Sequence, residues 1–157
     1  MARMGSFSSD LKKLQKQLEK AAQEDDAFVE SCAKELAARL LAKVKKRTPV
    51  GEYDKPVSFK TKDGKEVSFT PKTGKKGGTL RRGWTVGEIQ KEGDTYMVEV
   101  INPTEYASYV EFGHRTANHK GWVKGQFMMT ISEQELQSIA PQVLEAKAAK
   151  FLRECMK

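Results

Sequence analysis

The chain has 157 residues, 38% of them hydrophobic, and carries a formal net charge of +7. This length allows one globular domain with a real core but is short for two, and the basic balance favours acidic partners, nucleic acid among them. No stretch approaches the roughly 18 uninterrupted apolar residues of a membrane helix, and the opening MARMGSFSSDLKK lacks an apolar signal core, so we expect a soluble protein made in the cytoplasm.

Two amphipathic helices are predicted before the first proline. Residues 8–23 carry a thin apolar seam at helical spacing, with lysines on the other face. The seam residues are Leu11, Leu14 and Leu18. Residues 26–47 carry a wider stripe with an apolar residue at every fourth position, acidic residues at the start and basic residues at the end. Thr48 precedes Pro49, which disfavours helix, so the second helix should end near residue 47.

Residues 52–79 differ in composition, with Gly and Pro punctuation and few large apolar groups. If residues 62–64 form a three-residue loop with Gly64 left-handed, four apolar side chains share one face of a hairpin: Val57, Phe59, Val67 and Phe69. A two-residue Asp-Gly loop would place Phe59 opposite Ser68 instead, so the pattern favours the longer loop. We interpret this segment as a projecting arm outside the core that is mobile in the free subunit, and we expect its four apolar side chains to be assembly contacts, ordered by packing on an adjacent subunit or a partner protein.

The next stretches, TLRRGWTVGEI and TYMVEVIN, are predicted to be strands joined by the turn QKEGD. These strands should form the central sheet. A short helix should follow, capped by Asn102 and ended by Gly113. Ser132 and Glu135 form a second capping box that should open a C-terminal helix, which Pro141 should kink or restart. Cys32 and Cys155 are too few for a disulfide framework and fit buried, reduced thiols.

The stretch YASYVEFGHRTANHKGWVKGQFMM contains both histidines beside a glutamate, which raises the question of a metal or catalytic site. His114 and His119 are separated by four loop residues and cannot share a helix face as zinc motifs require. No cysteine or serine has the surroundings of a nucleophile, and TGKKGGT departs from a phosphate-binding loop. We therefore predict no enzyme activity, no metal and no cofactor.

A basic run extends into the first predicted strand of the sheet and contains no acidic residue: Lys72, Lys75, Lys76, Arg81 and Arg82. Such local density suits contact with phosphates, so nonspecific DNA binding is one hypothesis. No helix-turn-helix, zinc knuckle or RNA-binding aromatic pattern accompanies the run. The alternatives are an acidic protein surface as partner, or a simple solvated face.

The stretch from residue 106 to residue 124 has two interpretations. In the first interpretation the stretch serves folding alone, through a fold-anchoring motif. Its tyrosines and valine hold a short helix on the core, and its glutamate pairs with Arg81, Arg82 or Arg115. That motif comprises Tyr106, Tyr109, Val110, Glu111, Phe112 and Gly113. In the second, the following loop contacts a partner through His114 and Arg115, with Trp122 as the anchor.

Several segments in order resemble one family: RTPVG after a long helix, GTLRRGWTV, VINPTEYASYVEFGHR, and GQFMMTIS before a closing helix. The set is similar to the tail-completion, or neck, proteins of long-tailed bacteriophages and prophages, which are often described as minor tail components. The resemblance covers roughly residues 28–155, and YASYVEFGHR is its most specific part. The long insertion after Gly51 departs from shorter members of the family.

The resemblance implies a structural morphogenetic protein of the virion and no catalytic residues. It implies an α+β fold, in which a small antiparallel sheet packs against a long N-terminal helix and a C-terminal helix within one domain, residues 1–157. It also implies a homo-oligomeric ring, a hexamer by family analogy, at the neck where the tail joins the head-side connector. Its partners would be tail-terminator and connector, portal or stopper proteins, with assembly in the host cytoplasm and no membrane. The alternative function is nonspecific DNA binding through residues 72–82.

Overall fold

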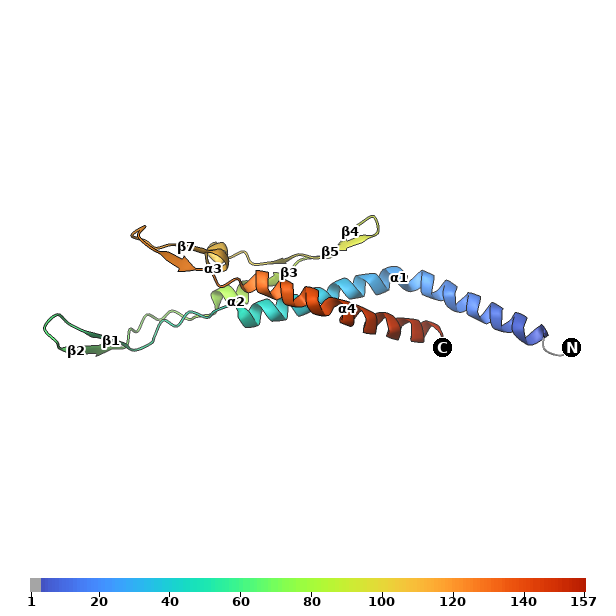
Figure 1. Cartoon of the computed structure of the whole chain (residues 1–157), viewed down its shortest axis with the longest axis horizontal. Helices are drawn as coiled ribbons and strands as arrows, with labels where there is room; N and C mark the ends of the chain where they lie inside the picture. Colours follow the sequence, from blue (N-terminus) through green and yellow to red (C-terminus); the bar gives the residue numbers. More distant parts are fainter. Residues whose placement is uncertain (1–3) are drawn as a thin grey trace.

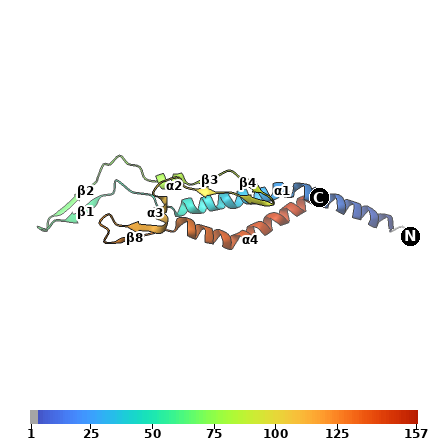
Figure 2. The ribbon, with the colours of Figure 1, turned by 90° about the horizontal axis from the view of Figure 1, so that it is seen from above.

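The computed structural model describes residues 4–157 as an elongated molecule built on two long helices. Helix α1 spans Met4–Arg47 and helix α4 spans Met128–Cys155; they run antiparallel and side by side (Figures 1 and 2). Helix α4 continues through Pro141 and bends along its length in Figure 2. No helix within the described range is long and apolar enough to cross a membrane.

Helix α1 is one continuous helix, so the prediction of two helices separated near residue 24 is wrong. No Gly or Pro occurs between residues 6 and 48, and the polar residues at the expected boundary are all compatible with a helix interior. The end at Arg47 is as predicted. The N-terminal part of α1 extends beyond the end of α4, where the Gln17 side chain donates to the Met156 carbonyl at 2.6 Å (Figure 1).

The strands form four separate antiparallel pairs within residues 4–157. They are β1 (Val57–Lys60) with β2 (Glu66–Phe69), β3 (Thr85–Val86) with β6 (Val100–Ile101), β4 (Gln90–Glu92) with β5 (Thr95–Met97), and β7 (Gly113–Arg115) with β8 (Trp122–Lys124). The α+β class, with antiparallel strands beside a long N-terminal and a C-terminal helix, is confirmed. The expected central sheet is reduced to short ribbons along α1.

Helix α2 (Thr79–Gly83) replaces the first half of the predicted strand. In a strand, Arg82 would share the inward face with Leu80 and Trp84, because alternate residues point the same way. One helical turn keeps Leu80 and Trp84 on the buried side and leaves Arg82 exposed. The core forms where α1, α2 and the start of α4 meet, around four buried side chains: Val44, Leu80, Trp84 and Met128.

Thr48 links these elements by hydrogen bonds and is fully buried. Its hydroxyl donates to the Val44 carbonyl at 2.5 Å and accepts from Trp84 Nε1 at 2.8 Å. Its carbonyl accepts from Arg81 Nε and Nη2 at 3.1 and 2.7 Å. One residue just after α1 therefore fixes α2 and the buried indole against the end of α1.

Candidate assembly surfaces

Glu111 joins helix α3 (Ala107–Phe112) to the first turn of α4. Its side chain is only 6% exposed. Oε2 accepts from the Met129 N–H at 2.9 Å, and Oε1 accepts from the Thr130 N–H at 2.9 Å and the Thr130 hydroxyl at 2.7 Å. The carboxylate thus satisfies amides that the start of a helix leaves without partners, at the end that favours negative charge.

This arrangement corrects two predictions. Glu111 does not pair with an arginine, and α4 begins four residues before the predicted cap, so Ser132 lies inside the helix and its hydroxyl donates to the Met128 carbonyl at 2.5 Å. Asn102 likewise caps no helix: its side chain donates to the Leu80 carbonyl at 2.7 Å and α3 starts only at Ala107. Glu111 on α3 thus caps α4 in place of the predicted local cap, and the start of α3 has no side-chain cap among the described residues.

The aromatic residues of the fold-anchoring motif face outward. Tyr106, Tyr109 and Phe112 are 42%, 58% and 63% exposed, so the prediction that the tyrosines anchor the helix to the core is wrong. Val110 and Ala107 pack against the core instead. Gly113 ends α3 as predicted, with φ at 87°. The outer face of α3 is therefore a largely exposed apolar surface, on which Phe112 meets Phe127 edge to face with ring centroids 6.5 Å apart.

The β7–β8 hairpin continues this exposed surface. Its backbone passes so close to the end of α3 that a β-carbon at Gly113 would collide with the Val123 carbonyl oxygen. Tyr109 and His114 meet edge to face, with ring centroids 5.9 Å apart. Trp122, the predicted partner anchor, is 63% exposed and is paired with Arg115 across the hairpin.

The histidines do not converge on other ligands. His114 lies in β7, and His119 lies at the turn with φ at 56°. Within residues 4–157 no group of three His, Cys, Asp or Glu side chains is placed to hold a metal ion. The prediction that His114 contacts a partner stays a prediction.

The arm has the register predicted from the sequence. Val57 pairs with Phe69 and Phe59 with Val67, and Gly64 is left-handed with φ at 78°. The four apolar side chains therefore share one face, and all remain 37–50% exposed. Figure 1 shows the arm projecting from the end of the molecule opposite the N-terminus. The apolar face has no core behind it.

The root of the arm is held by short-range contacts. Asp54 Oδ1 accepts from the Thr73 N–H and hydroxyl, both at 3.2 Å. Gly51 and Gly77 approach so closely that a β-carbon on Gly77 would collide with the Gly51 carbonyl oxygen. The segments that lead into and out of the arm therefore touch where the arm meets the body.

The basic run divides into two parts. Arg81 binds the Thr48 carbonyl, and Arg82 Nη1 donates to the Gly77 carbonyl at 3.1 Å, so both guanidinium groups have structural partners. Lys72, Lys75 and Lys76 are exposed on the irregular segment that leads from β2 back to the body. Only the lysines are presented as the phosphate-contact hypothesis requires.

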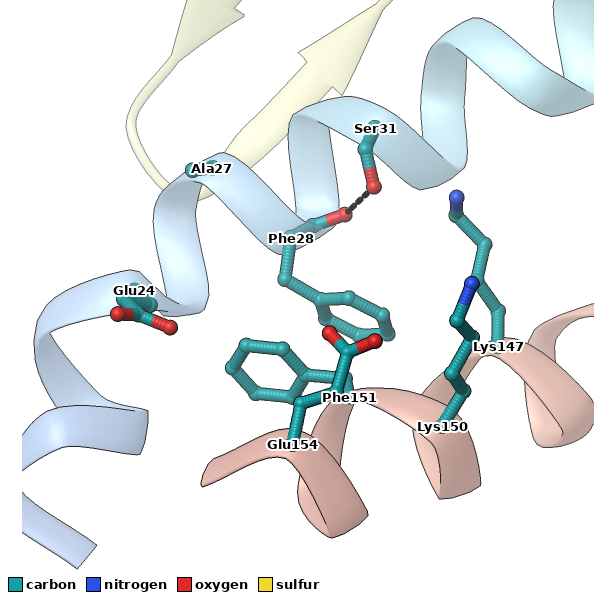
Figure 3. Close-up of a pocket in the computed structure, with 8 residues that line it drawn as sticks. All are labelled: Glu24, Ala27, Phe28, Ser31, Lys147, Lys150, Phe151 and Glu154. Atoms are coloured by element: carbon teal, nitrogen blue, oxygen red, sulfur yellow. Dashed lines mark hydrogen bonds between the residues drawn. The ribbon is translucent and has the colours of Figure 1, made fainter. Parts of the chain in front are cut away.

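A shallow cleft lies between α1 and the C-terminal half of α4. Phe28 and Phe151 stack across it, with ring centroids 4.5 Å apart and planes inclined by 17°. Figure 3 shows Lys147 and Lys150 to one side of the stacked rings and Glu154 beside them. The stack joins the two helices, and the charged groups stand at its open edges.

Both cysteines are buried thiols near this cleft, as predicted. Burial raises the pKa of Cys32 and of Cys155 above the ordinary thiol range. For Cys155 the neighbouring Glu24 carboxylate raises the pKa further. Because the thiolate is the nucleophilic form, this environment does not activate either residue.

The chain as a whole exposes far more surface than a compact protein. Its accessible surface is 12353 Å². A compact monomer of this mass, 17.6 kDa, would expose about 7,900 Å². The excess, about 4,400 Å², corresponds to several standard protein interfaces, each of which takes about 800 Å² from one partner.

Comparison with known proteins identifies one family. Residues 12–113, well over half of the chain, match the family model described as "Bacteriophage HK97-gp10, putative tail-component". No curated protein and no solved structure gives a significant match. The matched range includes α1 from residue 12 onward, the arm and α3, and it ends at Gly113.

Proposed function

Since the chain belongs to the HK97-gp10-like family of bacteriophage tail components, we propose that it forms a closed ring at the neck of the particle, where the tail joins the head-side connector. Membership of this family makes it a structural phage protein. The ring, the neck position and the head-to-tail joining role are the proposal.

The observation that carries the proposal is the surface excess of about 4,400 Å² over a compact monomer. Exposed apolar side chains occur on three projections: the arm, the β7–β8 hairpin with α3, and the N-terminal part of α1. Such faces are costly in water unless another surface covers them. Head-to-tail contacts between identical copies close into a ring when the rotation between copies permits it.

The two ends of the molecule differ, which suits a protein that has one neighbour on each side. The arm and the β7–β8 hairpin project at one end, and the N-terminal part of α1 projects at the other (Figures 1 and 2). We propose a tail-terminator protein at one end and a connector, portal or stopper protein at the other. Assembly takes place in the host cytoplasm and the product is part of the virion.

The copy number follows from family analogy, which gives a hexamer in the particle. The isolated chain is expected to be a monomer at low concentration, because neighbouring proteins complete its interfaces. Purified particles should contain the chain by mass spectrometry, and a reconstruction of the neck should resolve six copies around the axis. A single copy on the axis, or no copy in the particle, would contradict the proposal.

Nonspecific DNA binding is the second candidate, supported by the exposed lysines at the arm root, Lys72, Lys75 and Lys76. The hydrogen bonds of Arg81 and Arg82 within the body leave this site weaker than the sequence implies. Measuring binding to a DNA duplex over a range of salt concentrations separates the two candidates. A chain that is absent from particles but binds DNA tightly at physiological salt would favour this function over the ring.

A further inference from the structure

A second open cleft lies on the body, between α1 and the β3–β6 pair. It has a volume of about 630 Å³. Most of its lining is aliphatic: Ala38, Leu41, Val86, Ile89 and Val98. The charged lining residues are Glu30 and Lys34, which pair with each other at 2.7 Å, and Glu88. The cleft therefore offers aliphatic walls to apolar side chains and one unneutralised carboxylate, Glu88, to a basic partner.

The arm carries an apolar face of matching character. Val57, Phe59, Val67 and Phe69 are half-exposed on one side, and Phe59 and Phe69 meet edge to face with centroids 6.5 Å apart. An isolated two-stranded hairpin is marginal in water, so the arm gains stability if another surface covers this face. In its own chain the arm projects away from the body and from β3, which contributes to the lining of the cleft (Figure 1). Its occupant must therefore be another molecule.

The charges of the two surfaces are complementary. The arm, residues 52–79, has seven lysines against four acidic residues, a net charge of +3. The hairpin that forms one wall of the cleft, residues 85–101, has four acidic residues against one lysine, a net charge of −3. Opposite charge favours encounter of these surfaces and disfavours pairing of two arms or two clefts.

We infer that the apolar face of the arm binds in the α1/β3–β6 cleft of a second copy of this chain. The contact is head to tail, because it uses two different surfaces, and each copy can both donate an arm and accept one. This inference rests on the proposed self-assembly and specifies its contact. The face is small beside a standard interface of about 800 Å² per partner, so a single contact is weak and the closed ring adds the contacts together.

Disulfide trapping in the full-length chain tests the inference, because oxidation captures even a weak contact. A chain carrying Val67→Cys is mixed with an isotope-labelled chain carrying Val98→Cys, and the initial rate of mixed-disulfide formation is measured by non-reducing electrophoresis and mass spectrometry. The matched control replaces Val67→Cys by Ser68→Cys, on the opposite face of the same strand. The wild type, with both cysteines buried, gives the background.

The pair containing Val67→Cys should react at least tenfold faster than the pair containing Ser68→Cys. Equal rates would overturn the inference, since they would show random collision. Val86→Cys is a second cleft position if Val98→Cys fails to fold by circular dichroism, and the same comparison then applies.

Glu88→Lys in the accepting chain should slow trapping several-fold, whereas Glu105→Lys, away from the cleft, should not. Equal effects of these two changes would overturn the choice of this cleft.

The two proposals fail in different ways. If a reconstruction shows a ring and the two cysteine pairs react equally, the ring stands and the arm binds elsewhere. If the chain is absent from particles, the neck function fails, while the trapping rates still report whether arm and cleft meet.

Discussion

Removing the carboxylate of Glu111 is the sharpest test of how the fold is held together. The carboxylate lies on α3 and accepts three hydrogen bonds from the first turn of α4. It therefore connects α3 directly to α4. Glu111→Ala would leave two amides and one hydroxyl without their acceptor in a site that is almost fully buried. Glu111→Gln would keep the volume and one acceptor oxygen but lose the charge.

The expected magnitude follows from the number and kind of these bonds. Hydrogen bonds to a charged group contribute about 1.5–3 kcal/mol each, and their effects are not additive when they share one acceptor group. The charge at the helix N-terminus adds up to about 2 kcal/mol in a partly buried site. We expect Glu111→Ala to lower the free energy of unfolding by about 3–5 kcal/mol and Glu111→Gln by about 1–2 kcal/mol. For a chain of this size the alanine variant should melt roughly 6–20 °C lower.

Urea and thermal unfolding followed by circular dichroism would measure these differences. Glu105→Ala is the matched control, because Glu105 is an exposed carboxylate on the loop before α3 and should change stability by less than about 0.5 kcal/mol. Thr130→Val, which removes one of the three donors, should be less destabilising in the Glu111→Ala background than in the wild type. Equal stability of Glu111→Ala and the control would refute the capping role.

Four other predictions concern separate features. Thr48→Val should cost about 1–3 kcal/mol in urea unfolding, because a buried indole N–H loses its acceptor. Hydrogen bonds from Lys91 and Tyr96 and the charge of Lys91 lower the pKa of Asp26 in the folded protein. The Asp26 carboxylate therefore stabilises the fold at pH values above the ordinary aspartate pKa, and this stabilisation is lost as the pH falls through the folded-state pKa. Asp26→Asn should therefore melt below the wild type at pH 7, and the difference should shrink below pH about 4. Joining Gly51 to Gly78 should leave a folded, soluble chain by circular dichroism but reduce particle yield; unfolding would place the arm in the core. Replacing both histidines by alanine should leave metal content at background by elemental mass spectrometry, and stoichiometric zinc in the wild type would contradict this.

The parts of the fold that were predictable from the sequence are those set by neighbouring residues. The arm register follows from one turn, because Gly64 tolerates a left-handed backbone and alternation then fixes every pair in the hairpin. The end of α1 follows from the Thr48-Pro49 step. Both signals lie within a few residues of the feature that they determine.

Apart from the predicted break in α1, the errors lie where distant residues decide the local structure. The start of α4 depends on the Glu111 carboxylate, 18 residues before the Met129 amide that it accepts from. The local capping pattern of Ser132 and Glu135 predicted a helix start one turn later. Helix α2 depends on the hydrogen bonds from Arg81 to the Thr48 carbonyl, 33 residues away. The tyrosines of α3 matched a buried helical face by spacing, but spacing does not show which face meets the core. The apolar cleft has no sequence signal, because its walls come from two separated segments.

The contact between Gly51 and Gly77 has a consequence for how such a chain changes over generations. Because the two ends of the arm meet at one point on the body, a gene can gain, lose or exchange the 25 residues between them without moving the flanking backbone. The geometry of this root therefore allows the arm to vary in length and sequence independently of the helices that carry it.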